Sequence, residues 1–590
     1  MATKYAKTKP PTAEEIAHLI DLFSMQLFGE LEGLVTDLLK VHRQHALGWR
    51  LLVAALELQE KNATEALVQA KKTRFLTTTL VECCFQFALA QQQLGYLSGA
   101  IDCYRLLLET KPREPDAWNN LSLCLRLADN LDEAITCCQR ALKLRPDFAL
   151  AQNNLGLLLK DAARVEESRA AYQRAITTDP NYTDARSNLA YLLYFHHEFD
   201  DQAIRKHVEN LFPDLYQSMV VSAKSVSAEG RRLRIGYVSP DFRDHCQSLF
   251  TIPLLEHHDK EQFEIICYAD LDAPDDYSVR IKRSADLWRQ TNGMNDVELA
   301  HRIADDGIDI LVDLTMHMAK GRPLMFARKP APVQLAWLAY PGTTGIKAMD
   351  FRLTDPWLDP FDSDSSCYTE RSLRLADTFW CYDPHITDLE PNKLPALSNG
   401  FITFACLNNF CKVSDASLRT WAKVMARVKD SRLLLLSPQG QHRQHVLAQL
   451  AQGGISPDRV KFIAYLPRRD YLSTYHSVDL CLDTLPYNGH TTSLDSYWMG
   501  VPVVTQVGNT VAGRAGWSQL NNLGLPELAA IDDDSFVDIA FNLATDIPRL
   551  SELRQRLRHT MENSPLMDKQ RFARSMENVF KEAWRHYQSS

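Results

Sequence analysis

A step of 34 residues recurs in the first third of the chain and restricts its fold more than any other feature. An Asn-Leu pair begins at Asn120, at Asn154 and at Asn188, so the pair returns every 34 residues. A period of this length is typical of stacked helical hairpins, in which each unit packs against its neighbours to bury its apolar face. Prolines that can end the second helix of a unit keep the same step, at Pro112, Pro146 and Pro180.

The residues between these marks are typical of a tetratricopeptide repeat. Small side chains at Ala100, Ala134 and Ser168 would let the two helices of a unit approach closely. We therefore predict a superhelix of such repeats over residues 80–195. Residues 1–79 are helical by periodicity but have a looser register, which favours degenerate or capping repeats.

The repeated asparagines have two interpretations. Asn120, Asn154 and Asn188 could line a groove in which their amides bind the backbone of an extended peptide, or they could merely suit the first helix of each unit. The first interpretation makes protein or peptide acceptors the expected partners of the repeats. Homodimerisation through the repeats is left open.

Composition excludes several classes of protein. The formal net charge of −9 gives no general attraction for nucleic acid. The sequence has neither a signal-peptide pattern nor an apolar run of roughly 20 residues, so we expect a cytoplasmic protein without a membrane span. Thirteen cysteines show no paired zinc-type spacing, and most should be small core residues.

The second half of the chain has the pattern of parallel α/β lobes. After a helical connector at 196–230, nearly continuous apolar runs alternate with helical stretches. They predict a first lobe over 231–385, a linker over 386–399 and a second lobe over 400–590 that ends in an amphipathic helix. The predicted strands are 233–239, 263–269, 308–315 and 333–340, then 401–407, 432–437, 460–466, 478–484 and 501–507.

Polar clusters follow several of these strands, where ligands of open α/β sheets gather. His245 lies in a charged turn after the first strand, and Lys412 lies just beyond the strand at 401–407. A glycine and threonine turn occupies 340–345. The richest cluster is Tyr487-Asn-Gly-His-Thr-Thr-Ser-Leu-Asp495, in which a helix start could bind a diphosphate. Each cluster taken alone would suit an ordinary turn, a surface lysine or a capped helix.

Four segments together resemble the O-linked N-acetylglucosamine transferase family. They are LRIGYVSPDF with His245, PAPVQLAWLAYPGTTG, LNNFCK with Lys412, and DTLPYNGHTT, all after the repeat array. The resemblance implies a repeat superhelix followed by two Rossmann-like lobes in the arrangement called GT-B. It also implies an enzyme that moves N-acetylglucosamine from UDP-GlcNAc to Ser or Thr of proteins, with inversion and without a metal or other cofactor. The short connector between the lobes is similar to that of compact bacterial members.

The same resemblance assigns roles to residues. Lys412 would neutralise the departing diphosphate, Thr491 and Thr492 would bind it, and His490 with Asp495 would reach phosphate and ribose. His245 would act at the reacting centre, as a base or, by slight preference, as a positioning group. Further donor-side residues are Asn409, Arg468 and Tyr471, and the acceptor and sugar loop is Pro341, Gly342, Thr343 and Thr344.

Three alternatives stay open at this point. Related enzymes transfer fucose from GDP-fucose or glucose from UDP-glucose, and His490 favours UDP over GDP. A noncatalytic repeat scaffold is opposed by the presence of His245, Lys412 and His490. An epimerase or another enzyme acting on small molecules would leave the repeat groove without a purpose.

Overall fold

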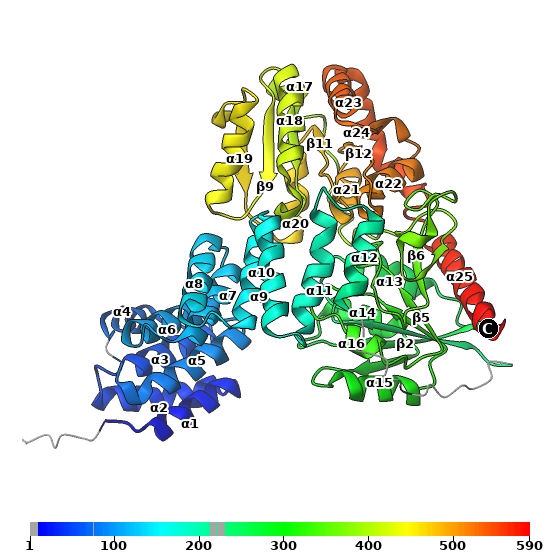
Figure 1. The fold of residues 1–590 in the computed structure, drawn as a ribbon. Coiled ribbons are helices and arrows are strands. Elements are labelled where there is room, and N and C mark those ends of the chain that lie inside the picture. Colours follow the sequence, from blue (N-terminus) through cyan, green and yellow to red (C-terminus); the bar gives the residue numbers. More distant parts are fainter. Residues whose placement is uncertain (1–9, 75, 213–220, 222–229, 590) are drawn as a thin grey trace, which may run out of the picture. The chain divides into compact units, whose positions relative to one another are not determined.

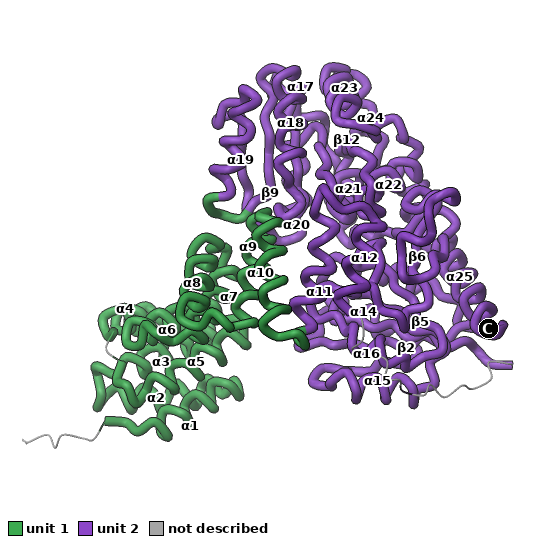
Figure 2. Tube along the Cα trace, in the orientation of Figure 1, with its two compact units in different colours: residues 1–182, 438–441 green, residues 183–437, 442–590 purple. Residues whose placement is uncertain are grey.

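The computed structural model describes residues 10–74, 76–212, 221 and 230–589. The chain divides into two compact units (Figure 2). Unit 1 consists of Met1–Tyr182 with Pro438–Gln441, and unit 2 consists of Thr183–Ser437 with His442–Ser590. None of the described helices is long and apolar enough to cross a membrane. Residues 213–220 and 222–229 of the predicted connector lie outside the described residues.

Unit 1 is built of helices that pair in sequence order, as the 34-residue step predicts. The small positions are fully buried at Ala100, Ala134 and Ser168. Gly156 is required for one close approach, because a Cβ there would lie 2.5 Å from the ring of Tyr172. The helices are α1 (Ala13–Ser24), α2 (Phe28–Val41), α3 (Ala46–Glu57), α4 (Thr64–Lys72), α5 (Val81–Gln93), α6 (Leu97–Thr110), α7 (Pro115–Leu127), α8 (Leu131–Leu144), α9 (Ala149–Asp161) and α10 (Val165–Thr178).

The repeat pattern continues into unit 2. Helix α11 (Thr183–Leu192) and the 3₁₀ turn η2 (Leu193–Phe195) carry the third Asn-Leu pair but are part of unit 2. They bury Leu192, Leu193, Tyr194 and Phe195 within it. Helix α12 (Asp201–Leu211) follows in the same unit.

Unit 2 contains two wholly parallel sheets (Figure 1), and the nine predicted strands are confirmed. The first has the order β3-β2-β1-β4-β5-β6-β7 and the second the order β10-β9-β8-β11-β12-β13. The first-sheet strands are β1 (Leu233–Ser239), β2 (Phe263–Ala269), β3 (Leu287–Gln290), β4 (Ile310–Asp313), β5 (Val333–Ala336), β6 (Phe351–Thr354) and β7 (Arg371–Arg374). The second-sheet strands are β8 (Thr403–Cys406), β9 (Arg432–Leu436), β10 (Val460–Ile463), β11 (Leu480–Leu482), β12 (Val503–Gln506) and β13 (Ala529–Ala530).

Four short strands were missing from the predicted set. β3, β7 and β13 lie at sheet edges, where one side of the backbone is unpaired and polar residues are tolerated. β6 has the sequence FRLT and buries an arginine, so no apolar run marks it. These strands lack the continuous apolar pattern by which the others were predicted.

Helices connect the parallel strands, since a parallel pair needs a crossover. The last helix, α25, runs back to the first lobe. Glu577 on α25 accepts a hydrogen bond from the Asp259 N–H at 2.8 Å, and its Oε1 lies 3.1 Å from His258 Nδ1. The helices that follow α12 in the chain are α13 (Ser248–His257), α14 (Asp276–Ser284), α15 (Asp296–Asp305), α16 (Pro323–Phe326), α17 (Ala396–Asn399), α18 (Asp415–Arg427), α19 (Gln441–Gln452), α20 (Arg468–Thr474), α21 (Thr491–Trp498), α22 (Ala515–Leu523), α23 (Asp533–Thr545), α24 (Ile547–Glu562) and α25 (Lys569–Ser589).

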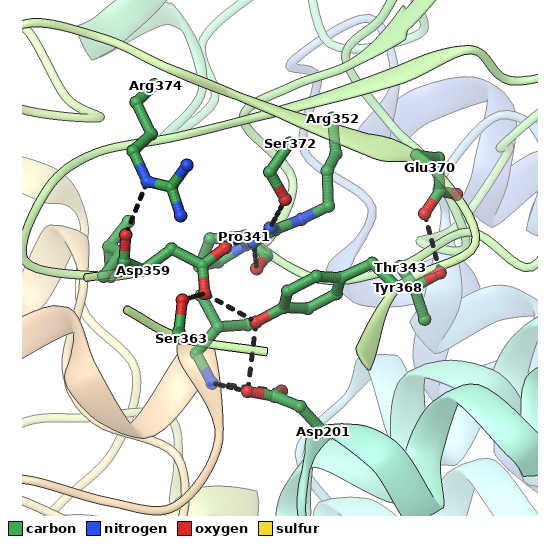
Figure 3. Close-up of polar contacts among 12 residues, drawn as sticks. Asp201, Pro341, Thr343, Arg352, Asp359, Ser363, Tyr368, Glu370, Ser372 and Arg374 are labelled. Atoms are coloured by element: carbon green, nitrogen blue, oxygen red, sulfur yellow. Dashed lines mark hydrogen bonds and ion pairs between the residues drawn. The ribbon is translucent and has the colours of Figure 1, made fainter. Parts of the chain in front are cut away.

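A buried set of charges joins α12 to both lobes of unit 2 (Figure 3). Asp201 on α12 accepts a hydrogen bond from the Val511 N–H at 2.9 Å and from Arg514 at 3.0 Å. Its Oδ2 also lies 3.1 Å from the Tyr368 hydroxyl of the first lobe. Arg352, which is 1% exposed, pairs with Asp359 and lies 3.5 Å from the centroid of the Tyr368 ring. Two carboxylates thus face two guanidinium groups, so the burial of each charge is compensated.

Of the thirteen cysteines, all within the described residues, eleven are buried and none is in a disulfide. The prediction that most are small core residues is therefore confirmed.

We expect Arg352→Met to destabilise unit 2 by about 3 to 5 kcal/mol, because the apolar side chain fills similar space but leaves Asp359 buried without its main partner. The urea midpoint measured by circular dichroism checks this. Arg556→Met is the control, since its pair with Glu552 is 73% and 62% exposed and should be worth under about 1 kcal/mol. Equal midpoints for the two variants would contradict the conclusion that Asp359 needs Arg352 as its buried partner.

Candidate functional site

The predicted lysine lies against the loop that follows β11. Lys412 ends the 3₁₀ turn η4 (Phe410–Lys412) just after β8. Its Nζ donates a hydrogen bond to the Asn488 carbonyl at 2.7 Å and lies 4.0 Å from the centroid of the Tyr487 ring. Burial lowers the pKa of Lys412 to about 8. The structure therefore places a partly desolvated ammonium at the carboxyl end of the second sheet.

The start of α21 meets this lysine. His490 is the N-cap residue of α21, and its side chain makes no capping bond, so the first backbone N–H groups of the helix have no cap from it. Burial, reinforced by the charge of Lys412, lowers the pKa of His490 well below its usual value. The imidazole is thus neutral at pH 7. Thr491 and Thr492 are half-buried at this helix start.

Asn408 fixes the position of the helix start. Its amide donates to Asp483 at 3.0 Å and to the Thr484 hydroxyl at 2.8 Å, and its carbonyl accepts the hydroxyl of Thr492. The predicted neighbour, Asn409, is exposed and begins η4. Asn409 stays a prediction for the donor site, and Asn408 was not among the predicted residues. The place of Asn408 at the end of a buried strand, between two apolar stretches, is the signal that could have identified it.

The predicted donor-side residues lie in two hydrogen-bonded sets. Arg468 pairs with Asp495 through contacts of 2.7 and 3.0 Å, and the Tyr382 hydroxyl donates to Asp495 at 2.6 Å. Tyr471 and Tyr475 are linked by their hydroxyls at 2.9 Å, and Tyr475 donates to the Thr492 carbonyl at 3.0 Å. Both oxygens of Asp495 are therefore engaged within the protein.

His245 lies in the turn between β1 and α13. The Gln247 N–H donates to His245 Nδ1 at 3.3 Å, and Asp241 Oδ2 lies 3.7 Å from the same nitrogen. Burial lowers the pKa of His245, although Asp241 raises it. A neutral imidazole that accepts at Nδ1 carries its proton on Nε2, so the ring offers a hydrogen-bond donor there.

The predicted acceptor loop is buried in the first lobe. The Thr343 hydroxyl donates to Glu370 at 2.7 Å, and the Thr344 hydroxyl and N–H also bond to Glu370. The Thr343 N–H donates to the Tyr194 hydroxyl of η2 at 2.9 Å. A Cβ at Gly342 would lie 2.1 Å from that hydroxyl, so only glycine fits. Pro341 contributes its carbonyl, which accepts from Arg352 at 3.0 Å.

This loop braces η2 and β6 in the structure. Neither Glu370 nor Tyr194 was among the predicted residues, because each is far from the loop in the sequence and carries no motif of its own.

The three asparagines of the repeats lie in different settings. Asn154 is 5% exposed and donates to Asn119 at 2.8 Å, whereas Asn120 is half-buried and donates to the Tyr104 hydroxyl at 3.2 Å. Asn188 is half-buried on α11, which belongs to unit 2. The amides of Asn120 and Asn154 thus bond within unit 1.

Asp313 is a further buried group that sequence reasoning missed. It ends β4, and its Oδ1 accepts the N–H groups of Thr315 and Met316, each at 2.9 Å. Its Oδ2 has no hydrogen-bond partner among the described residues. Burial raises the pKa of Asp313 to about 6. Costly charges of this kind gather at functional sites.

Two parallel sheets with polar loops at their carboxyl ends, preceded by helical hairpins, define a repeat-bearing α/β protein with two Rossmann-like lobes. The sequence pattern of glycosyl transferase family 41 matches residues 206–389 and 384–576, and the tetratricopeptide repeat pattern matches 115–148 and 149–182. The chain belongs to glycosyl transferase family 41. The family and the fold expected from the sequence are thereby confirmed.

Several relatives are similar to about two thirds of the chain. A rice protein named "probable UDP-N-acetylglucosamine–peptide N-acetylglucosaminyltransferase SPINDLY" is 36% identical over 67% of this chain and 44% of its own length. The Caenorhabditis elegans UDP-N-acetylglucosamine–peptide N-acetylglucosaminyltransferase is 26% identical over 65% of this chain and 44% of its own length. The chain thus spans less than half the length of these curated relatives.

A solved structure is similar over most of the chain. It is a mutant of the Thermobaculum terrenum O-GlcNAc transferase, with a TM-score of 0.81 and 32% identity. The match covers 87% of this chain and 99% of that one.

We expect Asp313→Asn to stabilise the protein by about 2 to 3 kcal/mol at pH 8, because the fold holds the pKa near 6 whereas the unfolded value is about 3.9. For a carboxyl whose pKa is raised on folding, stability is present below the unfolded pKa and lost as the pH rises through the folded one. The advantage of the variant should therefore shrink by about 1 kcal/mol at pH 5.

Urea unfolding at both pH values measures this difference. Asp388→Asn is the control, since Asp388 is 68% exposed and its ion pair with Arg469 lies at the surface, where such pairs contribute little to stability. A gain for Asp313→Asn that is independent of pH would show that the buried charge of Asp313 is not its cause.

Proposed function

We propose that this protein transfers N-acetylglucosamine from UDP-GlcNAc to the hydroxyl of Ser or Thr in protein substrates, with inversion. The observation that carries the proposal is the half-buried ammonium of Lys412 beside the start of α21. A diphosphate bound there would meet a fixed positive charge and backbone N–H groups at once. The matching relatives and the similar solved structure, which are named as N-acetylglucosaminyl or O-GlcNAc transferases, support it.

The groups of the site suit displacement of a nucleoside diphosphate. The acceptor oxygen attacks the anomeric carbon as the bond to the diphosphate breaks on the opposite face, which inverts the configuration. The proton of the acceptor hydroxyl passes to a phosphate oxygen of the departing diphosphate or to solvent. Lys412 neutralises the charge that develops on the departing phosphate. His245, with its proton on Nε2, orients acceptor and phosphate rather than removing a proton, and alignment supplies much of the acceleration. This charge stabilisation by the chain itself supports transfer without a bound metal.

UDP is the proposed nucleotide. His490 is neutral and lies at the helix start, so its ring can form hydrogen bonds to the donor without repelling Lys412. Thr491, Thr492, Arg468, Tyr471 and Asp495 are proposed for the rest of the donor site. For Asp495 to reach the ribose, the donor must share the carboxylate with Arg468 and Tyr382. The repeats are proposed to hold the protein acceptor.

Calorimetry without added metal should show binding of UDP and UDP-GlcNAc to the wild-type protein and no more than weak binding of GDP and GDP-fucose. UDP-glucose serves to rank the sugars. A preference for GDP would indicate a fucosyltransferase instead. The absence of binding for all of these nucleotides would indicate a noncatalytic repeat scaffold.

Lys412→Ala should keep the fold but lower turnover by about 10²- to 10³-fold, since the departing diphosphate loses its counter-charge. In the wild type, kcat/KM for the donor should fall as the pH rises through about 8, because Lys412 of the ligand-free enzyme loses its proton there. Transfer of labelled GlcNAc to peptides, with and without EDTA, measures both effects. Lys423→Ala is the control, as this lysine is 55% exposed on α18. Wild-type turnover in Lys412→Ala would overturn the mechanism.

A further inference from the structure

We propose that Tyr487 is a positioning residue that holds the Lys412 ammonium charged and aimed, and that α11 and η2 hold Tyr487 in place. The inference rests on the proposed function, because it concerns how the lysine that faces the diphosphate is prepared. It adds Tyr487 to the residues of the lysine site. It also makes the site depend on α11 and η2, the segment that follows the described repeats of unit 1.

The contact between the two side chains is close, and the tyrosine is shielded from water while the lysine is half-buried. Lys412 Nζ lies 4.0 Å from the centroid of the Tyr487 ring, and Tyr487 is 2% exposed. The negative face of an aromatic ring attracts an ammonium, and the attraction is strongest where both groups are desolvated. The next residue, Asn488, accepts one of the three N–H bonds at 2.7 Å. Two contacts from one loop therefore fix the direction of the ammonium and leave N–H donors for a ligand.

Aromatic residues from a distant segment hold the tyrosine. The Phe195 ring stacks on Tyr487 with centroids 4.9 Å apart and an angle of 26°. The Tyr191 ring meets it edge-on at 6.2 Å, and the two hydroxyls are hydrogen-bonded. His490 lies 4.9 Å away from the Tyr487 ring. Because Phe195 ends η2 and Tyr191 lies on α11, the end of the repeat pattern completes the wall of the lysine site.

The same segment is fixed on the first lobe. Tyr191 and Tyr194 pack against Tyr340 with centroids 5.3 and 5.1 Å apart. Tyr194 also accepts the N–H of Thr343. Tyr487 thus belongs to an aromatic cluster that includes both lobes and α11.

The charge of Lys412 depends on a small set of neighbours. Burial lowers its pKa, and the groups that face it and raise its pKa come from four elements. His490 is neutral and adds no opposing charge. These groups are Cys411 on η4, Asp483 after β11, Cys406 on β8 and Cys246 after β1. Loss of the ring would remove one attraction for the ammonium while burial remains, so the lysine should lose its proton at a lower pH.

The test compares UDP affinity from pH 6.5 to 9.5 for the wild type, Tyr487→Phe and Tyr487→Leu, measured by calorimetry. Wild-type affinity should fall above about pH 8, where Lys412 loses its charge. Tyr487→Phe keeps the ring and should reproduce the wild-type profile. Tyr487→Leu keeps an apolar side chain but no ring, so the fall should begin at lower pH and UDP should bind roughly tenfold more weakly at pH 8.

Two further variants separate the role of the ring from general damage. Tyr465→Leu is the control, because Tyr465 is 88% exposed in the same lobe, and it should leave the profile unchanged. Phe195→Leu leaves Lys412 and Tyr487 intact but removes the stacking ring, and it should shift the profile in the same direction by a smaller amount. It keeps the test open if Tyr487→Leu does not fold.

The outcomes distinguish the two claims. If the wild type binds UDP and neither Tyr487→Leu nor Phe195→Leu moves the pH profile, the positioning role is wrong while the proposed function stands. If the wild type binds no UDP at any pH, the proposed function fails and this inference fails with it.

Discussion

One carboxylate, Asp201, bonds to both lobes of unit 2 and helps to fix how they meet. It bonds to Val511 and Arg514 of the second lobe and lies 3.1 Å from the Tyr368 hydroxyl of the first. Buried charges tolerate little displacement, because each needs its partner at short range. The helix that carries Asp201 follows η2, so the contact also fixes where the aromatic residues of η2 reach the lysine site. The geometry of the lysine site thus depends on the contacts of Asp201, although none of these contacts involves Lys412 or Tyr487.

The sequence predicted the parts of the fold that follow a regular pattern. The 34-residue step predicted the helical hairpins, and continuous apolar runs predicted the longer parallel strands. The short edge strands and β6 escaped, because they contain polar or charged residues whose burial depends on distant partners. Arg352 on β6 illustrates this, since its position is explained only by Asp359, Ser372 and the Pro341 carbonyl around it.

The sequence could predict those residues of the candidate site that belong to short local motifs. Lys412 and His490 come from separate motifs, and the structure brings them together at one edge of the second sheet. Thr343 and Thr344 show the limit of such reasoning. Hydroxyls in a glycine turn suggest a ligand, but these two bond to Glu370, which is 26 and 27 residues away. A hydroxyl can bind a ligand or brace a loop with the same chemistry, so the bracing bonds to Glu370 could not be predicted from the turn, and the acceptor role of this loop stays a prediction.

The low pKa of Lys412 has a consequence for how a ligand would bind. An ammonium held near pKa 8 is partly neutral in weak base, because burial opposes its charge. A diphosphate placed beside it would restore the charge, and by linkage the same interaction energy raises the pKa of the lysine and the affinity for the anion. The neutral His490 contributes by adding no repulsion. Burial of Lys412 therefore lowers the positive charge of the site when no ligand is bound. It also strengthens the attraction between Lys412 and a bound diphosphate, whose charge grows as it departs in the proposed transfer.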